Sequence, residues 1–360
     1  MTTITTTSSN GSPPLTKTMK LPIDPAASKL FEPLRVGNME LKHRIVFPPL
    51  TRKRNDDDHT LLPFTVKYYA DRASAPETLV ISEATAVRIS KRAKITPRVL
   101  SGSYYFQQIW GMGRASYPEF MAKKGLKYRS SDAVAMEGVH TIPEEMTEEE
   151  ILEIIQSFVD TAKRVIAAGG DGRVDKWGGS TENRARLVLE VVKAVVDAVG
   201  ADRVELRLSP YAAFQQAEKG DIYGQYLSII KQLKEMAAPL AYLSLGEATG
   251  DPGALIFGGK TVNQGKTLDF ILDAWDNWSP VIMAGGYCPE TAAWALEGHY
   301  KKWNTLVAFG RHFLAKVFRI RHGIELNKYD RPTFYLAKNE IGYDDYPFSE
   351  GYLAAARGGP

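Results

Sequence analysis

"PVIMAGGYCPETAAWALEGHYKKWNTLVAFG", residues 280–310, contains two short apolar runs that each end in glycine, with a segment of helical spacing between them. The runs 280–286 and 305–310 are predicted strands, and 289–300 is a predicted amphipathic helix. A strand, a helix and a second strand in this order indicate two parallel strands joined by a crossover helix. The stretch therefore predicts an α/β fold with a parallel sheet.

The same alternation continues towards both ends of the chain. Five more strands are predicted from apolar runs at 43–51, 78–85, 103–110, 203–210 and 240–247. Further helices are predicted at 147–170, 180–200, 224–236 and 266–278, with Thr147 and the three following glutamates as a capped start and Gly200 as a stop. Seven such strands alternating with helices, with one more strand implied by position, predict a (β/α)₈ TIM barrel.

Two parts of this pattern are weak. By its position, the fourth strand must lie within 171–177, where "DGRVDKW" offers only Val174 and Trp177 as apolar side chains, although barrel strands are buried on both faces. The segment 86–102, between the second and third strands, has five basic residues and an interior Pro97. We therefore expect a TIM barrel in which strand 4 and the helix between strands 2 and 3 are truncated or irregular.

Composition narrows the class of protein. The chain has 360 residues, 44% of them hydrophobic, and Lys and Arg exceed Asp and Glu by only three, so no nucleic-acid partner is expected. The single cysteine, Cys288, forms no intramolecular disulfide and no cysteine metal cluster, which favours the cytoplasm. No membrane span and no metal site are predicted. Residues 1–28, rich in Thr, Ser and Pro, are a predicted disordered tail, and 29–360 are a predicted single domain, monomeric or homodimeric.

Glycines at the carboxyl ends of the last two strands indicate a phosphate site, because TIM barrels commonly bind phosphate there. The candidates are Gly285, Gly286, Gly310 and Arg311. Glycine permits close approach of the backbone, and arginine supplies a fixed positive charge. The alternative is that the glycines only make tight turns and Arg311 pairs with an acidic side chain of a helix.

Other strand ends are polar. Thr51, Arg52, Glu83, Thr85, Gln107, Gln108, Trp110, Arg207 and Ser209 all lie at or near the carboxyl end of a predicted strand. An amide, an arginine and a hydroxyl at one rim suit the edge of a planar heterocycle, with the arginine stabilising negative charge on it. Polar packing inside the barrel is the alternative.

Nine motifs occur in order along the chain. They are "PPLTR" (48–52), "YYADRAS" (68–74), "LVISEAT" (79–85), "QQIWGMGRAS" (107–116), "WGGSTENRAR" (177–186), "LRLSPYAAF" (206–214), "AGGY" (284–287), "VAFGRHF" (307–313) and "LNKYDRPTFY" (326–335). Together they closely resemble the old yellow enzyme family of FMN-dependent ene-reductases. The resemblance implies an FMN-binding barrel that takes hydride from NADPH and reduces the activated alkene of a small enone or enal.

The resemblance also implies roles for individual residues. Pro49 and Thr51 would lie against the flavin, Ala84 and Gln108 at its pyrimidine side, and Arg207 at the N1 and O2 region. The phosphate would be bound by Gly285, Gly286, Gly310 and Arg311. The substrate side of the ring would be lined by Trp110, Phe334 and Tyr335.

One family segment is absent. The family has a sequence of the form "VEIHxANGYLxxQF" in strand four, whereas here "GGDG" (169–172) runs directly into "RVDKWGGS" (173–180). The resemblance then implies loss of the two donors to the substrate carbonyl and of the tyrosine proton donor. Two more family segments are expected to be missing: the loop and helix that lead to strand three, after "ISEAT", and a short stretch within "HFLAKVFRIRHG". Tyr335 and Tyr104 are the remaining candidate proton donors, but aromatic packing is the stronger interpretation of both, so no catalytic residue is assigned.

Three functions follow as hypotheses. The first is an FMN-dependent, NADPH-oxidising ene-reductase, impaired by the missing groups. The second is a non-catalytic or folding-compromised variant of the same barrel, because an incomplete strand leaves neighbouring edges unpaired. The third is flavin-linked isomerisation or reduction of a specialised metabolite with another proton donor.

Overall fold

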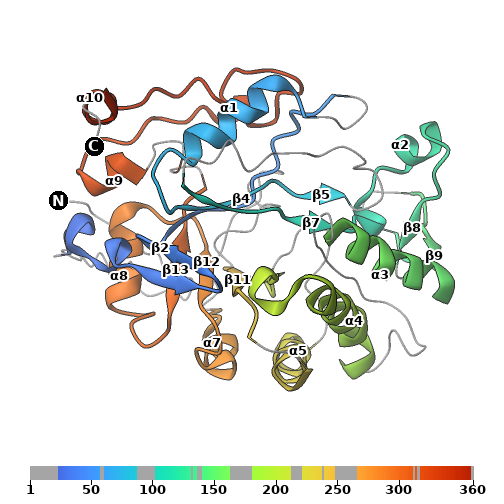
Figure 1. Cartoon of the computed structure of the whole chain (residues 1–360). Helices are drawn as coiled ribbons and strands as arrows, with labels where there is room; N and C mark the ends of the chain where they lie inside the picture. The colour runs from blue at the N-terminus through green and yellow to red at the C-terminus, as the bar shows by residue number, and fades with distance from the viewer. Residues whose placement is uncertain are drawn as a thin grey trace, which may run out of the picture.

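The structure is a computed structural model of the chain (Figure 1). It describes residues 23–56, 61–86, 102–130, 133–135, 140–162, 181–211, 221–236, 239–247, 266–310, 313 and 317–357. Two of the segments discussed above, 163–180 with the predicted fourth strand and 87–101 with the predicted irregular helix, lie outside these residues.

Seven parallel strands form the central sheet, and each falls within one of the seven predicted runs. They are β3 (Ile45–Phe47), β4 (Leu79–Ile81), β6 (Tyr104–Phe106), β10 (Glu205–Leu208), β11 (Tyr242–Gly246), β12 (Val281–Ala284) and β13 (Thr305–Ala308). Their order is β10-β11-β12-β13-β3-β4-β6. Strand β13, the last of the seven in sequence, pairs with β3, the first of the seven, as barrel closure requires. In the described part of the sheet the two edges are β6 and β10, on either side of the place that the fourth strand takes in a barrel.

Helices cover the outer side of the sheet (Figure 1). They include α1 (Pro63–Arg72), α3 (Glu148–Ala162), α4 (Thr181–Val199), α5 (Ile222–Met236), α7 (Asp269–Trp275) and α8 (Pro289–Glu297). Apolar side chains of α4, α5 and α7 pack with those of β10, β11 and β12 in one buried cluster. At the start of α3, Thr147 and Glu150 cap each other's backbone N–H groups, and Gly200, at φ 89°, follows α4, so both predicted boundaries are confirmed.

Most of the inside of the sheet is apolar, and a hairpin closes it at the amino end of the strands. Its strands are β1 (Leu34–Val36) and β2 (Met39–Leu41), which pair antiparallel. Val36, Met39 and Leu41 pack with inward side chains of the sheet, among them Val46 and Leu306. The sequence did not predict this hairpin, because its three-residue strands are too short to show a clear period.

Gly37, in the hairpin turn, is expected to be sensitive to substitution. Its φ is 55°, and a Cβ there would lie 2.6 Å from the carbonyl oxygen of Asp202. We expect Gly37→Ala to lower the free energy of unfolding by about 3 kcal/mol, from left-handed strain and overpacking together. Gly125→Ala is the matched control, because Gly125 has φ 65° but no atom within 4 Å of its Cβ position. Equal losses in urea unfolding of the two variants would contradict this.

The packed chain begins before the predicted boundary at residue 29. Pro25–Ala27 forms a short 3₁₀ turn, and Ser28 is 5% exposed. The backbone N–H of Lys29 donates to Glu297 at the end of α8, at 2.8 Å. Residues 25–28 therefore already pack on the domain.

Candidate functional site

The parallel sheet brings most of the predicted site residues to one rim. Pro49 and Thr51 follow β3, Ala84 follows β4, Gln108 follows β6, and the two glycines 285 and 286 follow β12. Neighbouring ends are in contact: a Cβ on Gly310 would lie 3.4 Å from the Leu50 side chain. Gln108 is bonded to the end of β4, since its N–H donates to Ser82 Oγ at 2.9 Å. Arg311 lies outside the described residues.

Arg207 is the cation at this rim. Its side chain is half-buried, its Nη1 donates to Ser244 Oγ at 3.0 Å, and its Nη2 lies 3.8 Å from the position of a Cβ on Gly246. The guanidinium therefore reaches the carboxyl end of β11. Burial lowers the pKa of Arg207, with Glu205 opposing the shift, and the group stays charged. A fixed positive charge beside a small residue fits the anionic edge of a flavin ring.

Glu205 lies two residues before Arg207 on the same strand. Burial raises the pKa of Glu205 to about 7, although the charge of Arg207 lowers it. Its Oε2 is buried and makes no hydrogen bond with any residue in the described part of the chain. Sequence reasoning did not single out this residue, because a strand residue facing the barrel interior is recognised only once the register is known.

Gly285 allows the Glu247 side chain to lie directly against the backbone of the loop after β12. A Cβ at this position would lie 2.9 Å from the Cβ of Glu247, so any larger residue would displace that side chain. The Glu247 carboxylate accepts hydrogen bonds from the hydroxyls of Tyr287 and Tyr300, the second at 2.5 Å. Gly286 has φ 76°, which favours glycine. The loop after β12 is therefore shaped by glycine and a fixed carboxylate that the sequence did not predict.

The three predicted substrate-side residues fall into two groups. Trp110, in β7 (Ile109–Trp110), packs with the apolar cluster of α4 and α5. Phe334 and Tyr335, in the 3₁₀ helix η9 (Arg331–Tyr335), lie beside the loop after β3, and the guanidinium carbon of Arg52 is 5.1 Å from the centroid of the Phe334 ring. Phe334 is 7% exposed and Tyr335 is 41% exposed. Tyr335 is therefore the more accessible of this pair.

Histidines at the rim would be the natural replacements for the missing substrate donors, but three of the four described histidines lie elsewhere. His43 precedes β3 at its amino end, and His299 follows α8 and pairs with Asp269 at 2.8 Å. His322 packs on Phe318. The part of the chain that the structure describes contains no group of three potential metal ligands. Among the same residues, no helix is both long enough and apolar enough to cross a membrane.

His43 is expected to make stability fall in acid. Its Nδ1 accepts from the N–H of Ile45, and its Nε2 lies 2.9 Å from Thr78 Oγ1, which itself donates to Ala75 O. The ring is therefore neutral, and burial lowers its pKa to about 4 from the ordinary 6.5. A lowered histidine pKa stabilises the fold above pH 6.5, and this contribution, about 3 kcal/mol, is lost as the pH falls from 6.5 towards 4.

The measurement is urea unfolding of the parent and His43→Gln at several pH values across that window. The difference between the two should shrink as the pH falls, because glutamine does not titrate. A constant difference would contradict the neutral buried ring.

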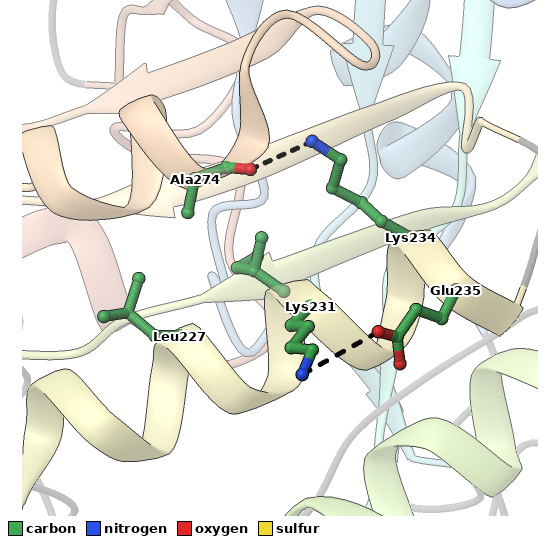
Figure 2. A pocket seen from close by; sticks show the side chains of 6 residues that line it. Leu227, Lys231, Lys234, Glu235 and Ala274 are labelled. Carbon is green, nitrogen blue, oxygen red and sulfur yellow. Dashed lines mark hydrogen bonds and ion pairs between the residues drawn. The ribbon is translucent and has the colours of Figure 1, made fainter.

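A surface cavity of about 460 Å³ lies between α5 and α7, outside the barrel (Figure 2). It is lined by Leu227, Ile230, Lys231, Lys234, Glu235 and Ala274. Lys234 donates to the carbonyls of Ala274 and Trp275, at 3.1 and 3.3 Å, and so caps the last turn of α7. Lys234 thus stabilises a helix end, and the side chains that line the cavity come from α5 and α7, not from the strand ends.

Comparison with known proteins agrees with this geometry. The model of the "NADH:flavin oxidoreductase / NADH oxidase family" matches residues 29–101, 88–174 and 170–327. "Aldehyde reductase FrzD" of Cladobotryum sp is 36% identical, covering 91% of this chain and 96% of that protein. "Chanoclavine-I aldehyde reductase fgaOx3" of Penicillium roqueforti is 37% identical, covering 91% and 98%. "Probable inactive reductase easA" of Epichloe festucae var. lolii is 34% identical, covering 91% and 97%.

Two solved structures share the fold. Old Yellow Enzyme from Pichia sp. AKU4542 has a TM-score of 0.76 and 29% identity, covering 90% of this chain and 95% of that one. Morphinone reductase has a TM-score of 0.74 and 26% identity, covering 90% and 97%.

The alignments also locate missing sequence. The alignment with the Cladobotryum protein is 370 residues long, more than the whole of this chain, so that relative has positions with no counterpart here. The family model matches this chain in three separate ranges, and consecutive ranges overlap at 88–101 and at 170–174. These are two of the places where the motifs predict missing segments.

Proposed function

The chain belongs to the NADH:flavin oxidoreductase / NADH oxidase family, as a relative of old yellow enzyme with FMN as its cofactor, and from this we propose that it reduces activated alkenes with NADPH as hydride donor. When bound, FMN would accept hydride from NADPH and deliver it to the β-carbon of the alkene. The observation that carries the proposal is the rim itself, where Arg207, Thr51, Gln108 and the glycines after β12 and β13 come together.

The protein's own residues would bind and orient the flavin. Arg207 would stabilise negative charge at one edge of the ring, because its guanidinium is fixed by Ser244 and cannot lose its proton under physiological conditions. The exposed Thr51 would present its hydroxyl to another edge. Gly286, with its left-handed φ, would let the phosphate approach the backbone, whereas the Glu247 side chain occupies the space beside Gly285. Arg311 would add a second positive charge there.

The proposed substrate is a small α,β-unsaturated aldehyde or ketone, with the aldehyde preferred. Three relatives are named aldehyde reductases, two of them for chanoclavine-I aldehyde. NADPH as donor is supported by a further relative, "NADP-dependent oxidoreductase lnbE" of Aspergillus flavus, which is 34% identical. Tyr335, with 41% of its surface exposed, is the residue we place beside the substrate.

A second candidate is a family member that binds flavin without efficient turnover. It is favoured by the break in the family match at 170–174, where the motif with the two substrate donors and the proton donor is expected, and by relatives named as probably inactive. Loss of one donor to a developing oxyanion lowers turnover by about 10²–10³. The two candidates share the flavin site and differ in the second half-reaction.

One anaerobic experiment separates them. FMN-loaded protein is mixed first with NADPH and then with cinnamaldehyde, while the visible flavin absorbance is followed. Reductase activity predicts bleaching by NADPH and recovery with cinnamaldehyde. Bleaching without recovery supports the second candidate, and absence of bleaching rules out the proposed use of NADPH.

A further inference from the structure

We propose that Arg52 is a positioning residue that fixes Phe334 and Tyr335, the substrate-side pair, relative to the flavin edge. The proposal rests on the proposed function only for the identity of the ligand. Its structural basis is that Arg52 makes hydrogen bonds to Glu83 after β4, to Phe334 in η9 and to Gly342.

The Arg52 side chain is 4% exposed and its guanidinium donates in several directions. Nε donates to the carbonyl of Phe334 at 2.9 Å, and Nη2 donates to the carbonyl of Gly342 at 2.5 Å. Nη1 lies 3.4 Å from the hydroxyl of Tyr68. One planar group thus binds two backbone carbonyls, on either side of the turn after η9, through two different nitrogen atoms, and the single nitrogen of lysine does not reproduce this arrangement.

Aromatic rings surround the same guanidinium. Its carbon is 5.1 Å from the Phe334 centroid and 5.2 Å from that of Tyr343. Tyr343 stacks on Tyr68 with centroids 3.8 Å apart and planes 5° from parallel. Cation–π contacts inside a buried cluster are stronger than at the surface. The Phe334 ring therefore cannot move away from Arg52 without exposing the charge.

The backbone of Arg52 belongs to the flavin side of the site. It directly follows Thr51, and its N–H donates to the carboxylate of Glu83 at 3.1 Å. Glu83 in turn precedes Ala84, another residue expected to contact the flavin. One residue thus connects the ends of β3 and β4 with the segment that carries the substrate-side pair.

Lys53 continues this arrangement at the surface. Its φ of 58° is left-handed, which is costly for a residue with a side chain. Its Nζ lies 5.8 Å from the ring centroid of Tyr117 and 6.0 Å from that of Tyr335. Residues 51, 52 and 53 therefore direct their side chains to the rim, the core and the mouth of the site.

The test compares Arg52→Lys with Arg72→Lys. Arg72 is also buried, at 3% exposure, and also donates to the carboxyl-terminal segment, at Tyr343 O, but it does not contact η9. Both variants are expected to melt earlier. Only Arg52→Lys should weaken cinnamaldehyde binding to the FMN-loaded protein, about tenfold, with FMN affinity within about threefold of the parent.

Hydrogen exchange of the peptide 331–336 gives a second measurement that needs no turnover. We expect faster exchange in Arg52→Lys and parent-like exchange in Arg72→Lys. The same exchange in both variants, or unchanged exchange in Arg52→Lys, would overturn the proposal. If the parent binds no FMN, the proposed function fails, whereas the exchange comparison still decides the role of Arg52.

Discussion

Arg207→Met is expected to weaken FMN binding by about 10–100-fold while the domain still folds. A hydrogen bond to a charged partner contributes about 1.5–3 kcal/mol, which corresponds to that range. The methionine would occupy similar space, and the neighbouring Glu205 can be neutral, because burial already raises its pKa to about 7. Titration of apoprotein with FMN, followed by flavin fluorescence, measures the effect.

Ser244→Ala is the matched control for Arg207→Met. It removes the hydroxyl that accepts a hydrogen bond from Arg207 Nη1 and leaves the charge of Arg207 in place. We expect a loss of about threefold to tenfold. If the methionine variant bound FMN as tightly as the parent, Arg207 would not face the flavin.

Restoring the missing segment is expected to raise alkene reduction by about 10²–10³. The change is an insertion between Gly172 and Arg173 of the corresponding segment of the Cladobotryum aldehyde reductase, which is 36% identical to this chain. The expected gain comes from returning hydrogen-bond donors to the carbonyl of the substrate. Steady-state consumption of NADPH with cinnamaldehyde measures it.

An insertion of the same length composed of Gly and Ser serves as the control for this chimera. It restores chain length without donors and should leave turnover at the level of the parent. Equal rates for the chimera and the control would show that the missing side chains do not limit the reaction.

The strands were predictable because most of them are short apolar runs with glycine or proline close by. The ends of the strands were less predictable. Strand β3 was expected over 43–51 but covers Ile45–Phe47, because Pro48 has no N–H to donate to a neighbouring strand. Helix α1 was missed, because it has no side-chain cap and its buried face includes Tyr68, Tyr69 and Arg72. When partly polar side chains form the buried face of a helix, the sequence shows no clear apolar period.

The rim was predictable in outline and not in its contacts. The carboxyl ends of parallel strands lie at the same rim of the barrel, so the residues at these strand ends can be expected to lie near one another. The partners of Arg52 were not predictable, since Phe334 is 282 residues away in sequence. The same holds for Glu247, whose place beside Gly285 depends on the register of β11 with β12.

These strand ends are expected to form an FMN site although the segment of the fourth strand is shortened. Calorimetric titration of the apoprotein with FMN tests this most directly. We predict saturable binding of one FMN per chain, and weaker binding in Arg207→Met. No saturable binding by a protein that melts cooperatively would contradict it.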